Sequence, residues 1–225
     1  MIPILFEIGP LKIGSFGVMV AIAFLTCAWV MRKEFKQKNF SPEWANNAVV
    51  IGAISGIVGS RLYFLFEEFD SFLIDPLGMI FSGSGLTWYG GFILAIIALI
   101  IYIRRLPAPS LELANIIAPV LLLGYGIGRI GCLLSGDGDY GPPSDLPWAM
   151  AFPNGLIPTT VPVHPTPIYE TVLSLTLFFI LCNLRKRNFP TGMMVSGMFI
   201  FYGFERFSNS RFKLPSSSQQ FSVSF

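Results

Sequence analysis

Residues 121–141, LLLGYGIGRIGCLLSGDGDYG, place an arginine between a long apolar run and a polar, glycine-rich loop. The apolar run begins at Ile116, so Arg129 falls near the end of a predicted helix. An arginine within a membrane helix costs about 2.5–3.5 kcal/mol on insertion scales, and it indicates a functional site by default. The stretch therefore predicts a membrane helix that ends at a buried cation.

The composition of the whole chain supports this interpretation. Of the 225 residues, 53% are hydrophobic and only 12% are charged, whereas soluble domains carry about 25% charged residues. The three cysteines, Cys27, Cys132 and Cys182, are far apart and form no metal-binding or disulfide pattern. We therefore expect an all-α integral membrane protein with no cofactor and no metal.

Apolar segments of about twenty residues are long enough to cross a bilayer as helices. Six segments qualify or nearly qualify: 13–31, 47–66, 86–103, 112–131, 167–184 and 191–207. The sequence thus predicts a polytopic transmembrane helix bundle of about six spans, treated as a single domain over residues 1–225.

The distribution of basic residues between these segments predicts the orientation. Basic residues fill three alternate loops: Arg32, Lys33, Lys36 and Lys38; Arg104 and Arg105; Arg185, Lys186 and Arg187. The other two loops, 67–85 and 136–166, contain acids and no Lys or Arg. Because short cytoplasmic loops are enriched in Lys and Arg, we expect the N-terminus and both acidic loops to lie outside the cytoplasm.

Three arginines lie inside predicted helices near their outer ends: Arg61, Arg129 and Arg206. Each could be a snorkelling side chain or a structural partner of a nearby acid. Three arginines at one depth on three helices instead favour an anion site, because the guanidinium donates bidentate hydrogen bonds and keeps its charge. At that depth, the simplest anion is a phospholipid headgroup.

Two further motifs carry candidate residues. The segment VHPTPIYE opens the fifth predicted span and contains His164, the one histidine of the chain, and Glu170. His164 precedes a proline, which favours a role at the start of a helix, although a catalytic role remains open. The segment YGFERF places Tyr202 and Arg206 on one helical face, at positions i and i+4.

Four segments, GSGLTWYGGFILA, IIAPVLLLGYGIGRIGCLLSG, HPTPIYE and FYGFERF, occur in this order. Together they resemble the prolipoprotein diacylglyceryl transferase family, and IGPLKIGSFGVMVAIAF and GSRLYFLF match the family's first two helices. The resemblance implies a multi-pass enzyme of the bacterial inner membrane with its active site towards the outer leaflet. It implies transfer of the diacylglyceryl group of phosphatidylglycerol to the lipobox cysteine thiol in the signal peptide of preprolipoproteins, which forms a thioether and releases glycerol 1-phosphate.

The resemblance also implies catalytic residues. Arg129 matches the arginine of the family's GRxGN signature, and Arg206 matches the arginine of its YGxxR segment. Both are expected to bind the lipid phosphate and to stabilise charge on it as it leaves. Tyr202 and Glu170 match the family's tyrosine one turn before Arg206 and the glutamate of its HPxQxYE segment.

Other matches suggest residues that bind phosphatidylglycerol. Arg61 matches a family arginine in the second helix, and Asp137 matches the acid that follows the signature. Tyr89, Gly90 and Gly91 occupy the place where many members have His-Gly-Gly, so we assign the tyrosine to catalysis and the glycines to lipid binding. Because tyrosine has a pKa near 10, it is a poor base, and the base remains unassigned.

Several positions depart from the family pattern: Phe16, Cys132, Pro167 and Ser210 replace a tyrosine, an asparagine, a glutamine and a glutamate. The family also continues into a seventh helix, whereas residues 208–225 are expected to be a remnant or tail in its place. These departures support an alternative, a catalytically inactive homologue that binds lipid or partner proteins. A small transporter is a weaker alternative, because no internal repeat is evident. The membrane is an expected partner, and nucleic acid is not.

Overall fold

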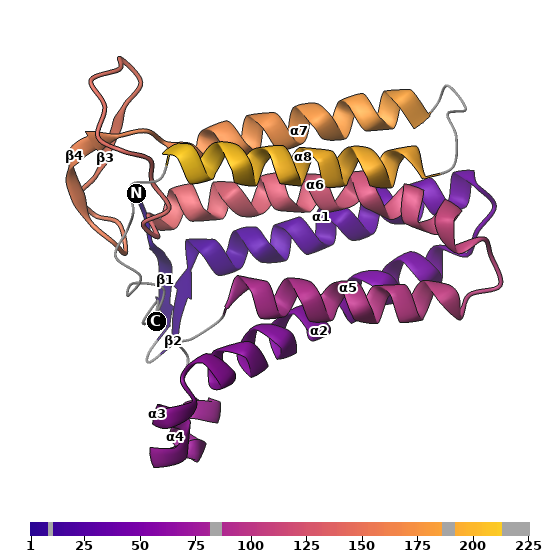
Figure 1. Cartoon of the computed structure of the whole chain (residues 1–225), viewed down its shortest axis with the longest axis horizontal. Helices are drawn as coiled ribbons and strands as arrows, with labels where there is room; N and C mark the ends of the chain where they lie inside the picture. Colours follow the sequence, from indigo (N-terminus) through magenta and orange to yellow (C-terminus); the bar gives the residue numbers. More distant parts are fainter. Residues whose placement is uncertain (9–10, 82–86, 186–191, 213–225) are drawn as a thin grey trace. The chain divides into compact units, whose positions relative to one another are not determined.

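The computed structural model describes residues 1–8, 11–81, 87–185 and 192–212 (Figure 1). The chain divides into two compact units, which are described separately. The first unit comprises Met1–Asn39 and the chain from Leu111 through the last helix, and the second comprises Phe40–Ser110.

The first unit contains four helices and two hairpins. Its helices are α1 (Ser15–Gln37), α6 (Ser110–Ser135, joined to the second unit at its first residue), α7 (Thr166–Arg185) and α8 (Met193–Phe212). Its strands are β1 (Ile4–Ile8), β2 (Leu11–Gly14), β3 (Met150–Phe152) and β4 (Thr159–Val163). The predicted tail at 208–225 therefore begins inside α8, and residues 213–225 lie outside the described part of the chain.

Helix α6 forms the centre of the first unit. In its most apolar window, 56% of the residues are buried, against 22% in α1 and 28% in α7. One core cluster joins Leu122 of α6 to Phe178 of α7 and Met198 of α8. On the α1 side, the Cys27 thiol donates a hydrogen bond to the carbonyl of Val120 at 3.4 Å. Helix α6 therefore holds its side chains against all three neighbouring helices.

The predicted outer loop 136–166 contains the β3–β4 hairpin, in which Met150 pairs with Val163 and Phe152 with Thr159. The Tyr140 ring stacks on the Phe152 ring at 4.1 Å. Gly136, which has φ of +63°, approaches Gly155 so closely that a Cβ would lie 2.6 Å from the Gly155 Cα. The loop between α6 and α7 is therefore fixed against its own hairpin.

The second unit contains α2 (Pro42–Glu67), α3 (Phe69–Ile74), α4 (Pro76–Phe81) and α5 (Trp88–Arg104). Helices α2 and α5 meet through glycines, because a Cβ on Gly90 would collide with Gly59 and Tyr63, and one on Gly91 would collide with Ser60. Small residues allow such close packing between helices in lipid. The predicted loop 67–85 includes α3 and α4, and residues 82–86 lie outside the described part.

Within the described residues, four helices, α1, α2, α6 and α7, are long and apolar enough to cross a membrane. The apolar stretches of α5 and α8, Tyr89–Arg104 and Met193–Phe204, are shorter. The predicted all-α polytopic bundle is confirmed. The orientation stays a prediction, as does a full crossing by α5 and α8.

Candidate functional site

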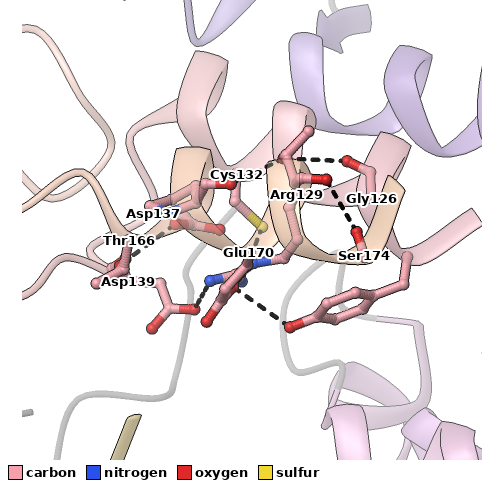
Figure 2. A network of polar contacts seen from close by, with 11 residues as sticks. Gly126, Arg129, Cys132, Asp137, Asp139, Thr166, Glu170 and Ser174 are labelled. Carbon is pink, nitrogen blue, oxygen red and sulfur yellow. Dashed lines mark hydrogen bonds and ion pairs between the residues drawn. The ribbon is translucent and has the colours of Figure 1, made fainter. Parts of the chain in front are cut away.

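The close crossing of α6 and α7 positions the site. A Cβ on Gly126 of α6 would lie 2.6 Å from the Ser174 hydroxyl of α7, and the Thr171 hydroxyl donates a hydrogen bond to the Gly126 carbonyl at 3.2 Å. The two helices run in opposite directions. Arg129 therefore lies one turn from the crossing on α6, and Glu170 lies one turn from it on α7, at the same end. Figure 2 shows these two side chains pointing towards each other.

The Arg129 guanidinium forms ion pairs with two carboxylates. Its Nε contacts Oε2 of Glu170, and its Nη2 lies 2.5 Å from Oδ2 of Asp139. The side chains are 12% (Arg129), 6% (Glu170) and 20% (Asp139) exposed. A buried cation is tolerated because both acids compensate its charge.

Two tyrosines extend the cluster to α8. The Tyr125 hydroxyl donates a hydrogen bond to Oε2 of Glu170 at 3.3 Å, and the Arg129 Cζ lies 6.0 Å from the Tyr125 ring centre. The Tyr202 ring meets the Tyr125 ring edge to face at 5.5 Å. The Tyr125 ring thus links Tyr202 of α8 to Arg129 of α6.

Asp137 joins the cluster through Cys132. The Arg129 Nη1 donates to the Cys132 Sγ at 3.5 Å, and the Cys132 thiol is hydrogen-bonded to the Asp137 carboxylate. Burial raises the pKa of Asp137, and the hydrogen bonds from Cys132 and from the Asp139 backbone N–H oppose this shift. Burial therefore favours the protonated form of Asp137.

Backbone contacts fix the position of Asp139. Its carbonyl accepts a hydrogen bond from the Thr166 hydroxyl at 2.5 Å, and its N–H donates to the Asp137 carboxylate at 3.3 Å. Gly138, with φ of +90°, makes the turn between the two acids. The start of α7 thus presents the Asp139 carboxylate to the end of α6 (Figure 2).

The structure brings four of the predicted site residues into this cluster: Arg129, Glu170, Tyr202 and Asp137. Arg206 lies on α8 one turn beyond Tyr202, and its side chain is outside the described part of the structure. Its expected contact with phosphate stays a prediction.

The remaining predicted residues belong to the second unit. The Arg61 Nη2 donates to the Met79 carbonyl, which links α2 to α4, and its Cζ lies 5.6 Å from the Phe64 ring centre. Tyr89 is exposed near the start of α5. Gly90 and Gly91 are buried against α2. Helix packing therefore accounts for both glycines. Lipid binding by Arg61, Gly90 and Gly91 and a catalytic role of Tyr89 stay predictions.

His164 lies two residues before the first residue of α7, close to the helix start that its position before a proline predicts. Its Nδ1 is 3.2 Å from the Tyr169 hydroxyl, which also accepts a hydrogen bond from the Trp148 Nε1 at 2.7 Å. The indole only donates, so the Tyr169 oxygen accepts from Trp148, whereas the direction of the His164–Tyr169 hydrogen bond depends on the histidine tautomer. Trp148 and Tyr169 line a cavity of about 600 Å³, and Glu170 directly follows Tyr169 in the sequence.

Sequence reasoning missed Tyr125 and the role of Asp139. A signal for Tyr125 was present, because it stands four residues before Arg129 and therefore shares its helical face. Asp139 was visible only as an acid of the loop, and its contact with Arg129 depends on the tertiary bond from Thr166.

These features define a helical membrane protein with a buried arginine–carboxylate cluster at one end of its central helix. The family model described as prolipoprotein diacylglyceryl transferase matches residues 3–224. The chain belongs to this family, and it is therefore a transferase and a multi-pass bacterial membrane protein of lipoprotein biosynthesis.

Relatives named phosphatidylglycerol–prolipoprotein diacylglyceryl transferase match most of the chain. The protein of Methylococcus capsulatus is 36% identical over 95% of this chain and 82% of its own length. That of Aeromonas hydrophila is 34% identical over 96% of this chain and 79% of its own. That of Leptospira interrogans is 28% identical over 86% of this chain and 69% of its own.

Proposed function

We propose that the chain transfers the diacylglyceryl group of phosphatidylglycerol to the lipobox cysteine thiol of a preprolipoprotein. The thiolate attacks the glycerol carbon that bears the phosphate ester. The C–O bond breaks, its electron pair leaves with the phosphate oxygen of glycerol 1-phosphate, and a C–S thioether forms. The thiol proton passes to a base that remains unassigned.

The buried guanidinium of Arg129 carries this proposal. It lies at the end of α6, and Glu170 on the neighbouring helix orients it through Nε. A fixed guanidinium in a poorly hydrated site stabilises charge that develops on a leaving phosphate. Membership of the family supplies the two substrates, because its relatives are named for phosphatidylglycerol and prolipoprotein.

The other residues of the cluster support Arg129. Glu170 and Tyr125 position the guanidinium, and Tyr202 packs against Tyr125. Arg206, which the family resemblance assigns to the same phosphate, stands four residues after Tyr202 in α8. Catalysis is thus mainly electrostatic and does not require Tyr89 to act as a base.

The proposed site opens towards the outer leaflet of the inner membrane. The loop that carries Asp137 and Asp139 contains no lysine or arginine, whereas the opposite end of α7 carries Arg185. The positive-inside rule therefore assigns the cluster to the extracytoplasmic side.

Transfer to a synthetic lipobox peptide tests the proposal. The purified chain is mixed with phosphatidylglycerol micelles and a peptide that carries one lipobox cysteine, and the peptide mass is measured. We expect a mass increase of one diacylglyceryl group for the wild type, and its loss for Arg129→Ala. Arg105→Ala, which removes an exposed arginine at the far end of α5, is the matched control and should keep the activity.

Two substrate controls separate this reaction from others. A peptide with serine in place of cysteine should remain unmodified, and phosphatidylethanolamine should not replace phosphatidylglycerol. No transfer by a folded wild-type chain would contradict the proposal and favour the inactive, lipid-binding homologue.

A further inference from the structure

We propose that Asp139 is an internal competitor for the phosphate-binding edge of Arg129, and that a phosphate ligand binds by displacing its carboxylate. This inference rests on the proposed function, because it describes how the lipid phosphate enters that same site. The recognised group is a phosphate ester, whether it belongs to a lipid headgroup or to a free phosphate.

The argument begins with the three nitrogens of the guanidinium. Nε contacts Glu170, Nη1 donates to the Cys132 Sγ, and Nη2 contacts Asp139. A phosphate binds arginine best through two parallel hydrogen bonds from one edge of the fork. The guanidinium offers two such edges, Nε with Nη2 and Nη1 with Nη2. Asp139 occupies Nη2, the nitrogen that both edges share, so its departure opens either edge.

The two carboxylates differ in how firmly they are held. Glu170 is 6% exposed, lies within α7 and accepts a further hydrogen bond from Tyr125. Asp139 is 20% exposed and lies in the loop, where Thr166 holds its backbone carbonyl. Rotation of the Asp139 side chain alone withdraws its carboxylate and leaves this backbone contact in place. Glu170 is thus the permanent partner of Arg129, and Asp139 is the exchangeable one.

The charges of the three described side chains favour such an exchange. Arg129 contributes one positive charge, and Glu170 and Asp139 contribute two negative charges. Beside these three side chains, a phosphate that left Asp139 in place would meet two carboxylates and one guanidinium, and the nearby like charges would disfavour its binding. Replacing the Asp139 carboxylate by the phosphate on Nη2 keeps one anion at that position.

The test compares phosphate binding by the wild type and Asp139→Asn. The probes are glycerol 1-phosphate, inorganic phosphate and phosphatidylglycerol in mixed micelles, and the measurement is calorimetric titration of the whole chain in detergent. Asn keeps the shape of the side chain and removes its charge, so we expect about tenfold tighter binding. Asp145→Asn, an exposed acid of the same loop, is the matched control and should bind as the wild type does.

Asp139→Glu keeps the competing charge and should keep the wild-type affinity, which a purely structural role of the aspartate would not require. Tightening with all three probes shows that the phosphate itself is recognised, and tightening with the lipid alone identifies the headgroup. If Asp139→Asn does not fold, Thr166→Val loosens the loop and should tighten binding about twofold.

Unchanged or weaker binding by the neutral variant would overturn the inference, as would the absence of binding by either protein. This outcome is distinguishable from failure of the proposed function. Peptide transfer with unchanged phosphate affinity removes only the competitor role of Asp139. Tighter phosphate binding without any peptide transfer by the wild type removes only the transferase reaction.

Discussion

Two arginines, one near each end of α7, form ion pairs with different numbers of described carboxylates. At its last residue, the Arg185 Nη2 pairs with Glu34 of α1, one cation with one carboxylate. Near its first turn, Glu170 shares Arg129 with Asp139, one cation with two carboxylates. A balanced pair serves to join two helices. The second described carboxylate at Arg129 is the one that the proposed exchange at Nη2 would displace.

The largest expected effect comes from replacing each arginine by lysine, which keeps the charge and removes the planar guanidinium. Arg129→Lys keeps the charge and loses the bidentate edge, so peptide transfer should fall by about 10²–10³-fold. Arg185→Lys keeps a charge beside Glu34 and should leave transfer per folded molecule unchanged. Equal losses in the two variants, measured by peptide mass and corrected for folded protein, would contradict the distinction.

A smaller effect is expected when the balanced pair is broken. Glu34→Gln leaves Arg185 without its charge partner in a region where both side chains are less than one-fifth exposed. The free energy of unfolding should fall by about 1–2 kcal/mol, between the values for exposed and fully buried pairs. Thermal unfolding in detergent measures this loss, and activity of the remaining folded protein should not change.

The crossing that brings Glu170 to Arg129 is tested by two glycines on α6. Gly126→Ala places a methyl group 2.6 Å from the Ser174 hydroxyl and should destabilise the chain by about 1 kcal/mol, because overpacking exceeds the gain in helix propensity. Gly128→Ala meets no described atom within 4 Å and should be neutral or slightly stabilising. A higher melting temperature for Gly126→Ala than for Gly128→Ala would show that the crossing is loose.

The smallest effect concerns pH. Burial raises the pKa of Asp137 above its ordinary value of 3.8, so the folded chain holds this proton more tightly than the unfolded chain does. The ionised form therefore costs stability, and this cost disappears as pH falls below the ordinary pKa. Asp137→Asn should melt at a higher temperature than the wild type at neutral pH, and the difference should shrink on acidification and vanish only below the ordinary pKa of 3.8. If the difference in melting temperature grew on acidification, the ionised form of Asp137 would stabilise the folded chain, and the prediction would be wrong.

The sequence was sufficient to predict the six long helices and part of the cluster, whereas the short helices α3 and α4 lie in a segment predicted as a loop. The apolar runs placed Arg129 at the end of α6 and Glu170 at the start of α7, and Glu170 was one of the acids that could pair with a buried arginine. Acid pairing, considered as an alternative for the buried arginines, is what the structure shows for Arg129. The proposed binding of phosphate by Arg129 is additional to its pairing with these acids.

Other features depend on tertiary contacts and could not be predicted. The position of Asp139 follows from the left-handed glycines of its loop and from Thr166, which is 27 residues away in sequence. The β3–β4 hairpin contains Pro162 inside a five-residue strand, which gives a weak strand signal. The family resemblance predicts lipid binding by Gly90 and Gly91, but only the structure shows that α2 fills the space beside them.

The crossing at Gly126 and Ser174 has a consequence for how the chain tolerates insertions. Arg129 and Glu170 are placed by counting one helical turn from the crossing, so a single inserted residue between Gly126 and Arg129 would rotate the guanidinium by about 100° away from Glu170. Residues added to the β3–β4 hairpin change neither count, but its tip is also held: Gly155 packs on Gly136, and the N–H groups of Leu156 and Ile157 donate to the carbonyls of Ser135 and Gly136 at the end of α6. The spacing along each helix is therefore fixed to the residue, and the hairpin tip is fixed to the end of α6.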